Sequence, residues 1–178
     1  MNRISISPKE LLVRPHHLWY HRSLLLTSGD FNKKDFNCMT VGWGSFGTMW
    51  SMPFVQVVVR PTRFTHQFME KYPEFTVCAF GKEFQKDLSL LGSISGRDGN
   101  KLADTSLTPI KSSIIAAPGY AEAELIIECR KIFSSTFKPD EFIDPSIEEK
   151  YPQKDYHTVY YGRIQAIFGI EKYQGTIN

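Results

Sequence analysis

The stretch "GWGSFGTMWSMPFVQVVVRP", residues Gly42–Pro61, decides between two folds for this chain. Its first six residues read G-x-G-x-x-G, the pattern of the turn that holds a dinucleotide in a Rossmann fold. In that fold a helix opens at the last glycine, and its N-terminus binds the pyrophosphate. Here Pro53 and a β-branched run follow Gly47, which predicts a strand. The acidic residue expected about 20 positions further on is also missing. The sequence therefore excludes a Rossmann site.

The segment that carries the glycines is itself predicted to be a strand. In "NCMTVGWG", residues 37–44, large and small side chains alternate, so Thr40, Gly42 and Gly44 would share one face. Two interpretations of this bare face stay open. A planar ligand lies against the exposed backbone with Trp43 as a wall, or a bulged strand packs closely on a neighbour. Gly47 is assigned to the turn before the next strand.

The rest of the chain is predicted to be mainly β. Strands are expected over residues 23–29, 53–61 and 74–80, and two long β-rich runs over 121–137 and 156–173. Short amphipathic helices are expected over 63–72, with Phe64, Phe68 and Tyr72 on one face, and around Leu88 and Leu91. The order differs from the βαβα rhythm of a parallel sheet. We therefore predict one domain, residues 1–178, built as an antiparallel barrel with a few helices.

Composition excludes several classes of function. The 178 residues carry a formal charge of only +2 and no Lys/Arg run, which argues against a nucleic-acid partner. No apolar stretch is long enough to predict a membrane span, so a cytoplasmic protein is expected. Cys38, Cys78 and Cys129 lie far apart among apolar neighbours, which is typical of small core residues. Aromatic residues make up 13%, which suits a β-rich core or a site for a flat ligand.

A second group of residues suggests a phosphate site. "RPTRFT" places Arg60, Arg63 and Thr65 where a predicted strand turns into a helix. Two guanidinium groups, a hydroxyl and the free N–H groups of a helix start are suited to a terminal phosphate. A solvated basic turn is the alternative. "SGRDGNK", residues 95–101, adds a Gly-rich loop with Lys101.

Together these stretches resemble the flavin reductase-like family with the FMN-binding split-barrel fold, and its flavoredoxin-type branch in particular. The resemblance rests on residues 37–80, 95–102, 121–130 and 155–164, in the family's order. The pair "N-x-M-T-x-x-W" and "V-R-P-x-R-x-T" is its most specific part. It implies a six-stranded antiparallel split barrel of Greek-key type that forms a homodimer and holds FMN near the dimer interface.

Carried over by position, the resemblance implies a set of cofactor-binding residues. Those that border the flavin ring would be Asn37, Thr40 and Trp43, with the backbone of Met39, Val41, Gly42, Gly44 and Ser45. Those that hold the phosphate and ribityl end would be Arg60, Arg63 and Thr65. Lys101 would reach the flavin from its loop and His157 from the late strand, although a histidine that opens an apolar strand is often structural.

Three functions follow from a flavin site. NADH or NADPH would reduce FMN in an oxidoreductase that supplies a partner such as a monooxygenase. An electron carrier would instead exchange electrons with other proteins without nicotinamide turnover. A binding module would store flavin or another planar cofactor. Hydride transfer to flavin needs no general acid or base, and no catalytic residue is assigned.

A histidine cluster lies outside this scheme. "RPHHLWYHR" contains His16, His17 and His21, of which His17 and His21 would share a helical face. Because no nearby Cys, Asp or Glu completes a ligand set, we predict no metal site there. A segment that caps the barrel, or a dimer contact, is the expected role.

Overall fold

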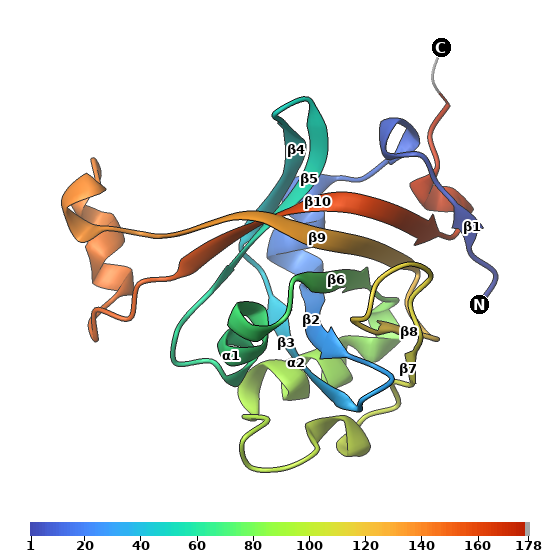
Figure 1. The fold of residues 1–178 in the computed structure, drawn as a ribbon, viewed down its shortest axis with the longest axis horizontal. Helices are drawn as coiled ribbons and strands as arrows, with labels where there is room; N and C mark the ends of the chain where they lie inside the picture. The colour runs from blue at the N-terminus through green and yellow to red at the C-terminus, as the bar shows by residue number, and fades with distance from the viewer. Residues whose placement is uncertain (177–178) are drawn as a thin grey trace.

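A long hairpin of two strands, β9 (Leu125–Thr136) and β10 (Thr158–Gly169), organises the main sheet in the computed structural model, which describes residues 1–176 (Figure 1). The main sheet has eight strands, seven of them in the antiparallel order β3-β2-β6-β9-β10-β5-β4 and the eighth, β1, paired with β10. The other strands of this sheet are β1 (Ile4–Ser5), β2 (Leu24–Asp30), β3 (Asp35–Val41), β4 (Gly44–Met49), β5 (Met52–Val59) and β6 (Glu74–Ala79).

The two ends of this strand order are joined by only two residues. β3 ends at Val41 and β4 begins at Gly44, so Gly42 and Trp43 connect the two edges of the sheet. Three Cα–Cα steps span at most about 11 Å. The sheet must therefore curl until its edges come close, which gives a split barrel. The mainly β fold and the strand–helix–strand order are confirmed, and the single strand predicted over 37–44 is wrong.

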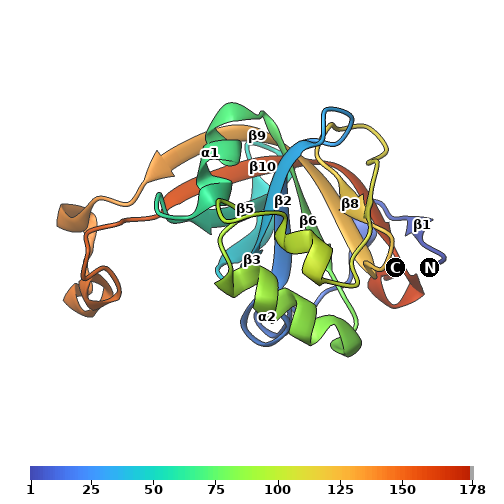
Figure 2. The same ribbon diagram turned by 90° about the horizontal axis from the view of Figure 1, so that it is seen from below.

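Two helices flank the sheet. α1 (Phe64–Lys71) follows β5, and α2 (Gln85–Ser93) lies across β2 and β3 (Figure 2). α1 buries Thr65 and Met69, whereas the predicted row of Phe64, Phe68 and Tyr72 is only half-buried beside them. A small second sheet pairs β7 (Pro109–Ile110) with β8 (Gly119–Tyr120).

Hydrophobic residues fill both faces of the sheet. Leu24 and Leu26 of β2 point into a core with Val55, Val57 and Ile127, which the curled sheet encloses. The intervening Leu25 belongs to a second core under α2, with Leu88 and Leu91 on the helix. Cys38, Cys78 and Cys129 are all buried as free thiols in these cores, as predicted. Successive leucines of β2 are all buried, and they face the two cores in turn, as the two-residue period of a strand requires.

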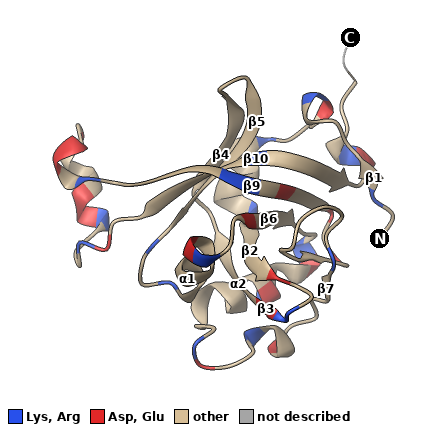
Figure 3. Cartoon of the chain, viewed as in Figure 1, with Lys and Arg blue, Asp and Glu red and all other residues tan. Residues whose placement is uncertain are grey.

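The predicted excursion between β9 and β10 is an arm that extends away from the barrel, with charges of both signs (Figure 3). It contains two short 3₁₀ turns, Pro139–Glu141 and Pro145–Lys150. Its base is attached to the residue that follows β5, because Arg60 Nη1 donates to both carboxylate oxygens of Asp155 at 2.7 and 2.8 Å. No helix in the described part of the chain is long and apolar enough to cross a membrane.

Candidate functional site

A cavity of about 110 Å³ lies where β3, the start of α1 and the segment after α2 meet. Five of the residues predicted from the sequence line it: Asn37, Met39, Arg63, Thr65 and Lys101. They come from three separate stretches of the chain. The tertiary structure thus brings residues predicted to border the flavin ring, Asn37 and Met39, next to residues predicted to hold the phosphate, Arg63 and Thr65.

Hydrogen bonds hold α1 against β3 beside this cavity. Asn37 Nδ2 donates to Thr65 Oγ1 at 2.7 Å, and Thr65 Oγ1 donates to the carbonyl of Cys38 at 3.1 Å. Both side chains are buried, so their polar groups need these partners. Arg63, at the N-cap position of α1, makes no side-chain capping bond. The first-turn N–H groups of Phe64 and Thr65 therefore receive no capping bond from Arg63, whereas that of His66 donates to the Arg63 carbonyl at 2.9 Å.

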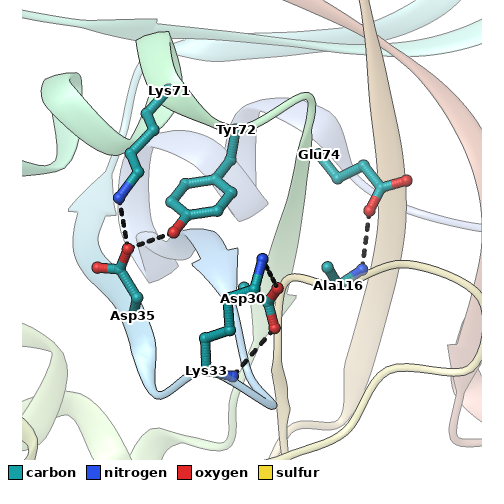
Figure 4. Close-up of polar contacts among 7 residues, drawn as sticks. All are labelled: Asp30, Lys33, Asp35, Lys71, Tyr72, Glu74 and Ala116. Atoms are coloured by element: carbon teal, nitrogen blue, oxygen red, sulfur yellow. Dashed lines mark hydrogen bonds and ion pairs between the residues drawn. The ribbon is translucent and has the colours of Figure 1, made fainter.

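The C-terminal end of α1 is also attached to β3, at the Asp35 side chain. Lys71 Nζ donates to Asp35 Oδ2 at 2.6 Å, and the hydroxyl of Tyr72 donates to the same oxygen (Figure 4). The hydrogen bonds from Lys71 and Tyr72 lower the pKa of Asp35 below its ordinary value. With contacts at both of its ends, α1 holds Arg63 and Thr65 in a defined position relative to β3.

Three cationic side chains border the cavity. Arg63 Nη2 donates to the carbonyl of Gly92 at 2.9 Å, and Arg97 Nη1 donates to the carbonyl of Thr62 at 3.1 Å. Lys101 Nζ donates to the carbonyls of Leu91 and Ile94 at 2.8 and 3.2 Å. The described residues that line the cavity include no Asp or Glu. This arrangement favours an anionic ligand.

Lys101 is the most enclosed of these cations. Its side chain is only 6% exposed, and burial, followed by the nearby charge of Arg63, lowers its pKa below the ordinary value. A buried ammonium without a carboxylate partner is costly unless another group compensates it. An anion in the cavity would provide that compensation.

Gly96 allows the loop after α2 to close over the site. A Cβ at this position would lie 2.2 Å from Asn37 Oδ1 and 3.0 Å from the ring of Phe64. Any side chain here would therefore push the loop away from β3. Arg97, Ser93 and Ser95 also line the cavity and were not among the predicted site residues. The "S-x-S-G-R" run, which begins at the last residue of α2, was the available signal.

Trp43 and His157 form a separate flank of the site. Their ring centroids lie 5.1 Å apart, and the indole of Trp43 is 50% exposed. His157 Nδ1 lies 2.8 Å from the hydroxyl of Tyr151, a residue of the arm. Arg60 belongs to this flank, because its guanidinium binds Asp155 and the carbonyl of Lys150 and lies over the Tyr151 ring. It does not line the cavity with Arg63, so the predicted pair of phosphate-binding arginines is separated in this structure.

His157 is expected to stay neutral at physiological pH. Burial, then the charge of Arg60, lowers its pKa to about 4. Because the unfolded chain binds this proton near pH 6.5 and the folded chain does not, stability should fall as the pH is lowered from about 6.5 towards 4. We expect the His157 ring resonances to stay constant in NMR spectra from pH 8 to about 5. A midpoint near that of the urea-unfolded chain would contradict this assignment.

Within the opening motif, Gly44 is the glycine that close packing requires most clearly. A Cβ on Gly44 would lie 2.5 Å from both the Gln56 carbonyl oxygen and the ring of Trp19. Gly42 is less restricted, since its nearest neighbour would be the Trp19 carbonyl oxygen at 3.4 Å. Gly47 lies within β4, so its assignment to a turn is wrong. The bare face predicted for a ring is covered by Trp19 at Gly44, and the close-packing interpretation is correct there.

The remaining predicted residues of this segment point in different directions. Val41 is buried in the barrel core. Ser45 Oγ donates to Gln56 Oε1 at 2.8 Å within the β4–β5 pair. Thr40 faces α2, where a Cβ on Gly92 would lie 2.1 Å from its hydroxyl oxygen. Of residues 37–45, Asn37 and Met39 line the cavity, so any contact from Thr40 to Ser45 to a ligand in it would come from the backbone.

The histidine cluster lies on a π-helical turn, His17–Arg22, outside the cavity. The rings of His17 and His21 lie 5.6 Å apart, so these two residues do share a face. Trp19, in the same turn, packs on Phe46 with ring centroids 5.1 Å apart. The segment thus caps the curled sheet, which is the first of the two roles predicted for it. Within residues 1–176, no group of three or more potential metal-ligating residues is found.

Comparison with protein families identifies the chain. The model of the flavin reductase like domain matches residues 21–176, most of the sequence. This chain belongs to the flavin reductase-like family. An uncharacterised protein of Pyrococcus abyssi is 30% identical over 153 residues, 84% of this chain and 74% of that protein. A match to an uncharacterised protein of Archaeoglobus fulgidus, 29% identical, covers 65% of this chain and 63% of that relative, less than two thirds of its length.

Solved structures share the flavin reductase-like fold. An FMN-binding domain of a flavin reductases-like enzyme from Shewanella baltica superposes with a TM-score of 0.68 at 17% identity, covering 94% of this chain and 77% of that one. Flavoredoxin of Desulfovibrio vulgaris gives 0.66 at 20% identity, covering 90% and 73%. An NADH:FAD oxidoreductase of Streptomyces globisporus gives 0.63 at 16% identity, covering 86% and 78%. These likenesses establish the split-barrel fold.

Proposed function

We propose that this flavin reductase-like protein binds FMN, with the phosphate in the cavity between β3 and α1. The observation that carries the proposal is the convergence of Arg63, Arg97 and Lys101 on a cavity without carboxylates, beside the start of a helix. These groups match a phosphate in charge and in hydrogen-bond donors. A cavity of about 110 Å³ admits a phosphate but not the three-ring flavin, so the ring must lie outside it.

The flavin ring would lie along the β3–β4 connection. Gly42 and Trp43 fall between the two strands, and the half-exposed indole of Trp43 offers a flat apolar surface. His157, neutral and held by Tyr151, would contribute an uncharged ring at the same flank. Bound FMN would supply the redox chemistry by accepting and passing on electrons. The chain's own residues would bind and orient it and limit access of water.

The activity we favour is NADH- or NADPH-dependent reduction of FMN, in support of an acceptor such as a partner monooxygenase. Family membership and the Streptomyces NADH:FAD oxidoreductase neighbour support it. The flavoredoxin neighbour supports the alternative, an FMN protein that exchanges electrons with other proteins. Storage of flavin is the third possibility. A cytoplasmic location stays a prediction.

Anaerobic reduction separates these activities. We expect protein loaded with FMN to show the absorbance of a bound flavin and to bleach within seconds to minutes after addition of NADH or NADPH. Free FMN at the same concentration, mixed with the same nucleotide, is the control. An FMN spectrum that only a reduced protein donor can bleach would favour the electron carrier. A protein that binds no FMN at all would overturn the whole proposal.

We further propose that the protein forms a homodimer through an apolar surface, here defined as the exposed Met49, Trp50, Ile132 and Phe133 with the half-buried Tyr161. The ring of Phe133 lies 6.0 Å from that of Trp50 and 5.8 Å from that of Tyr161. Trp50 is 54% exposed and Phe133 is 47% exposed. Contiguous apolar surface of this kind is typical of protein interfaces.

The turn between β4 and β5 presents Trp50 at this surface. Trp50 and Ser51 are its two central residues, with φ angles of 52° and 57°. A two-residue hairpin loop of type I′ requires positive φ at both positions. The hairpin geometry therefore places the Trp50 side chain at the tip of the β4–β5 pair, where it is 54% exposed.

Sedimentation velocity tests the dimer. We expect the wild-type protein to sediment as a dimer at micromolar concentration and the double variant Trp50→Ser/Phe133→Ser as a monomer. Tyr20→Ser is the matched control, because Tyr20 is a more exposed aromatic residue outside this surface. A wild-type protein that sediments as a monomer, or a dimer unaffected by the double variant, would refute this interface.

A further inference from the structure

A second, larger hollow of about 720 Å³ lies beside the proposed phosphate cavity, between the β2–β3 turn and the Gly-rich loop. The two share the walls formed by Asn37, Phe64, Gly96 and Lys101. Sites for small organic molecules occupy roughly 300–1,000 Å³. The proposed placement of FMN does not use this hollow, so its occupant is a separate question.

Aromatic side chains form much of its wall. Phe31 and Phe36 face each other across the β2–β3 turn with ring centroids 6.3 Å apart and planes tilted by 32°. Phe64, the first residue of α1, adds a third ring. Three rings along one hollow suit a planar aromatic ligand, which gains offset or edge-to-face contacts beyond simple burial.

The charge of the hollow is positive. Lys34 and Lys101 line it, and the described lining residues include no Asp or Glu. The carboxylate next to Phe36, that of Asp35, is bound by Lys71 and Tyr72 (Figure 4). Lys101 donates to two backbone carbonyls and forms no ion pair within residues 1–176. An anionic group on the ligand would therefore meet two cations with no competing carboxylate.

We propose that this hollow is a binding site for a small aromatic carboxylate, next to the FMN site and sharing Lys101 with it. The rings of Phe31, Phe36 and Phe64 would contact the aromatic part, and Lys34 would attract the carboxylate, with Lys101 adding positive charge at the shared wall. The amide side chains of Asn32 and Asn100, which also line the hollow, provide further donors. Because the proposal concerns a second site, it stands whether or not the protein reduces flavin.

Isothermal titration calorimetry with 2-naphthoate tests the proposal, first with FMN-free and then with FMN-saturated protein. We expect 2-naphthoate to bind in both states, and the neutral analogue 2-naphthamide to bind more weakly than 2-naphthoate. Lys34→Gln should weaken 2-naphthoate binding about fivefold and Phe36→Ala about tenfold. Lys33→Gln is the matched control, since Lys33 is adjacent but pairs with Asp30 at 3.1 Å and does not line the hollow.

Each other outcome overturns a defined part of the proposal. Absence of 2-naphthoate binding, or equal affinity for 2-naphthamide, would rule out an anion site. Equal effects of Lys34→Gln and Lys33→Gln would show only non-specific attraction to the turn. Full competition between FMN and 2-naphthoate would show that the hollow belongs to the cofactor site. Failure of FMN binding alone would contradict the proposed function and leave this site intact.

Discussion

Arg63→Ala is expected to weaken FMN binding by about 10- to 100-fold. Arg63 borders the cavity at the start of α1, and its loss removes a charge-assisted hydrogen bond to the phosphate. Hydrogen bonds to charged groups contribute about 1.5–3 kcal/mol, which corresponds to this range. Quenching of flavin fluorescence during titration of FMN with protein measures the dissociation constant directly.

The control separates a local effect from a general loss of positive charge. Arg163→Ala removes another exposed guanidinium, from β10, at a position that does not line the cavity. It should leave the affinity for FMN unchanged within about twofold, as expected for a screened surface charge. Equal affinities for the wild-type protein and Arg63→Ala would exclude the cavity as the phosphate site.

Arg60 provides a further comparison. The sequence grouped it with Arg63, whereas the structure pairs it with Asp155 at the base of the arm. Arg60→Ala should therefore loosen the base of the arm and raise the pKa of His157, with a smaller effect on FMN affinity than Arg63→Ala. A loss of FMN affinity equal to that of Arg63→Ala would mean that the arm moves on binding and frees Arg60.

Gly44→Ala is expected to lower the free energy of unfolding by about 2–3 kcal/mol, because it overpacks the barrel. Its new methyl group would lie 2.5 Å from a backbone oxygen in β5 and from the buried ring of Trp19. Neither neighbour can move easily, since one belongs to the sheet and the other, in the π-helical turn, is buried against Phe46. Urea unfolding of FMN-free protein, followed by tryptophan fluorescence, measures the loss.

Gly42→Ala is the matched control from the same motif. Its Cβ would meet only the carbonyl oxygen of Trp19 at 3.4 Å, an ordinary contact. We expect less than about 1 kcal/mol of destabilisation from it. If Gly44→Ala were as stable as wild type but lost FMN, then the glycine would serve the ligand and the packing interpretation would be wrong.

Local patterns predicted most of the elements. The β-branched run before Pro61 gave β5, and the spacing of Leu88 and Leu91 gave the buried face of α2. The same approach treated residues 37–44 as one strand, because alternation continues through Gly42 and Trp43. It also missed β4, whose partner β5 was predicted correctly. Alternation indicates which residues face the same way. It does not indicate where the chain leaves one neighbouring strand and pairs with another, as it does between β3 and β4.

The site was predicted in part for a similar reason. Thr65 and Arg63 were found because a strand-to-helix turn has a recognisable composition. Arg60 satisfies the same pattern three residues earlier, but Asp155 is 95 positions further along and binds it. No local pattern contains that contact. Trp19 and Gly44 are likewise separated by 24 intervening residues, so the sequence did not show what fills the space beside the glycine.

The sequence by itself determined the class of fold, the family resemblance and the residue types suited to a phosphate, because periodicity, turn chemistry and charge are local properties. It also excluded a Rossmann site, since a strand follows the glycines. Only the tertiary structure decided which cations share a cavity, that Arg60 is bound by the arm, and that Trp19 covers Gly44. Those outcomes depend on contacts between distant segments, which form only when the sheet curls and its two edges meet at Gly42 and Trp43.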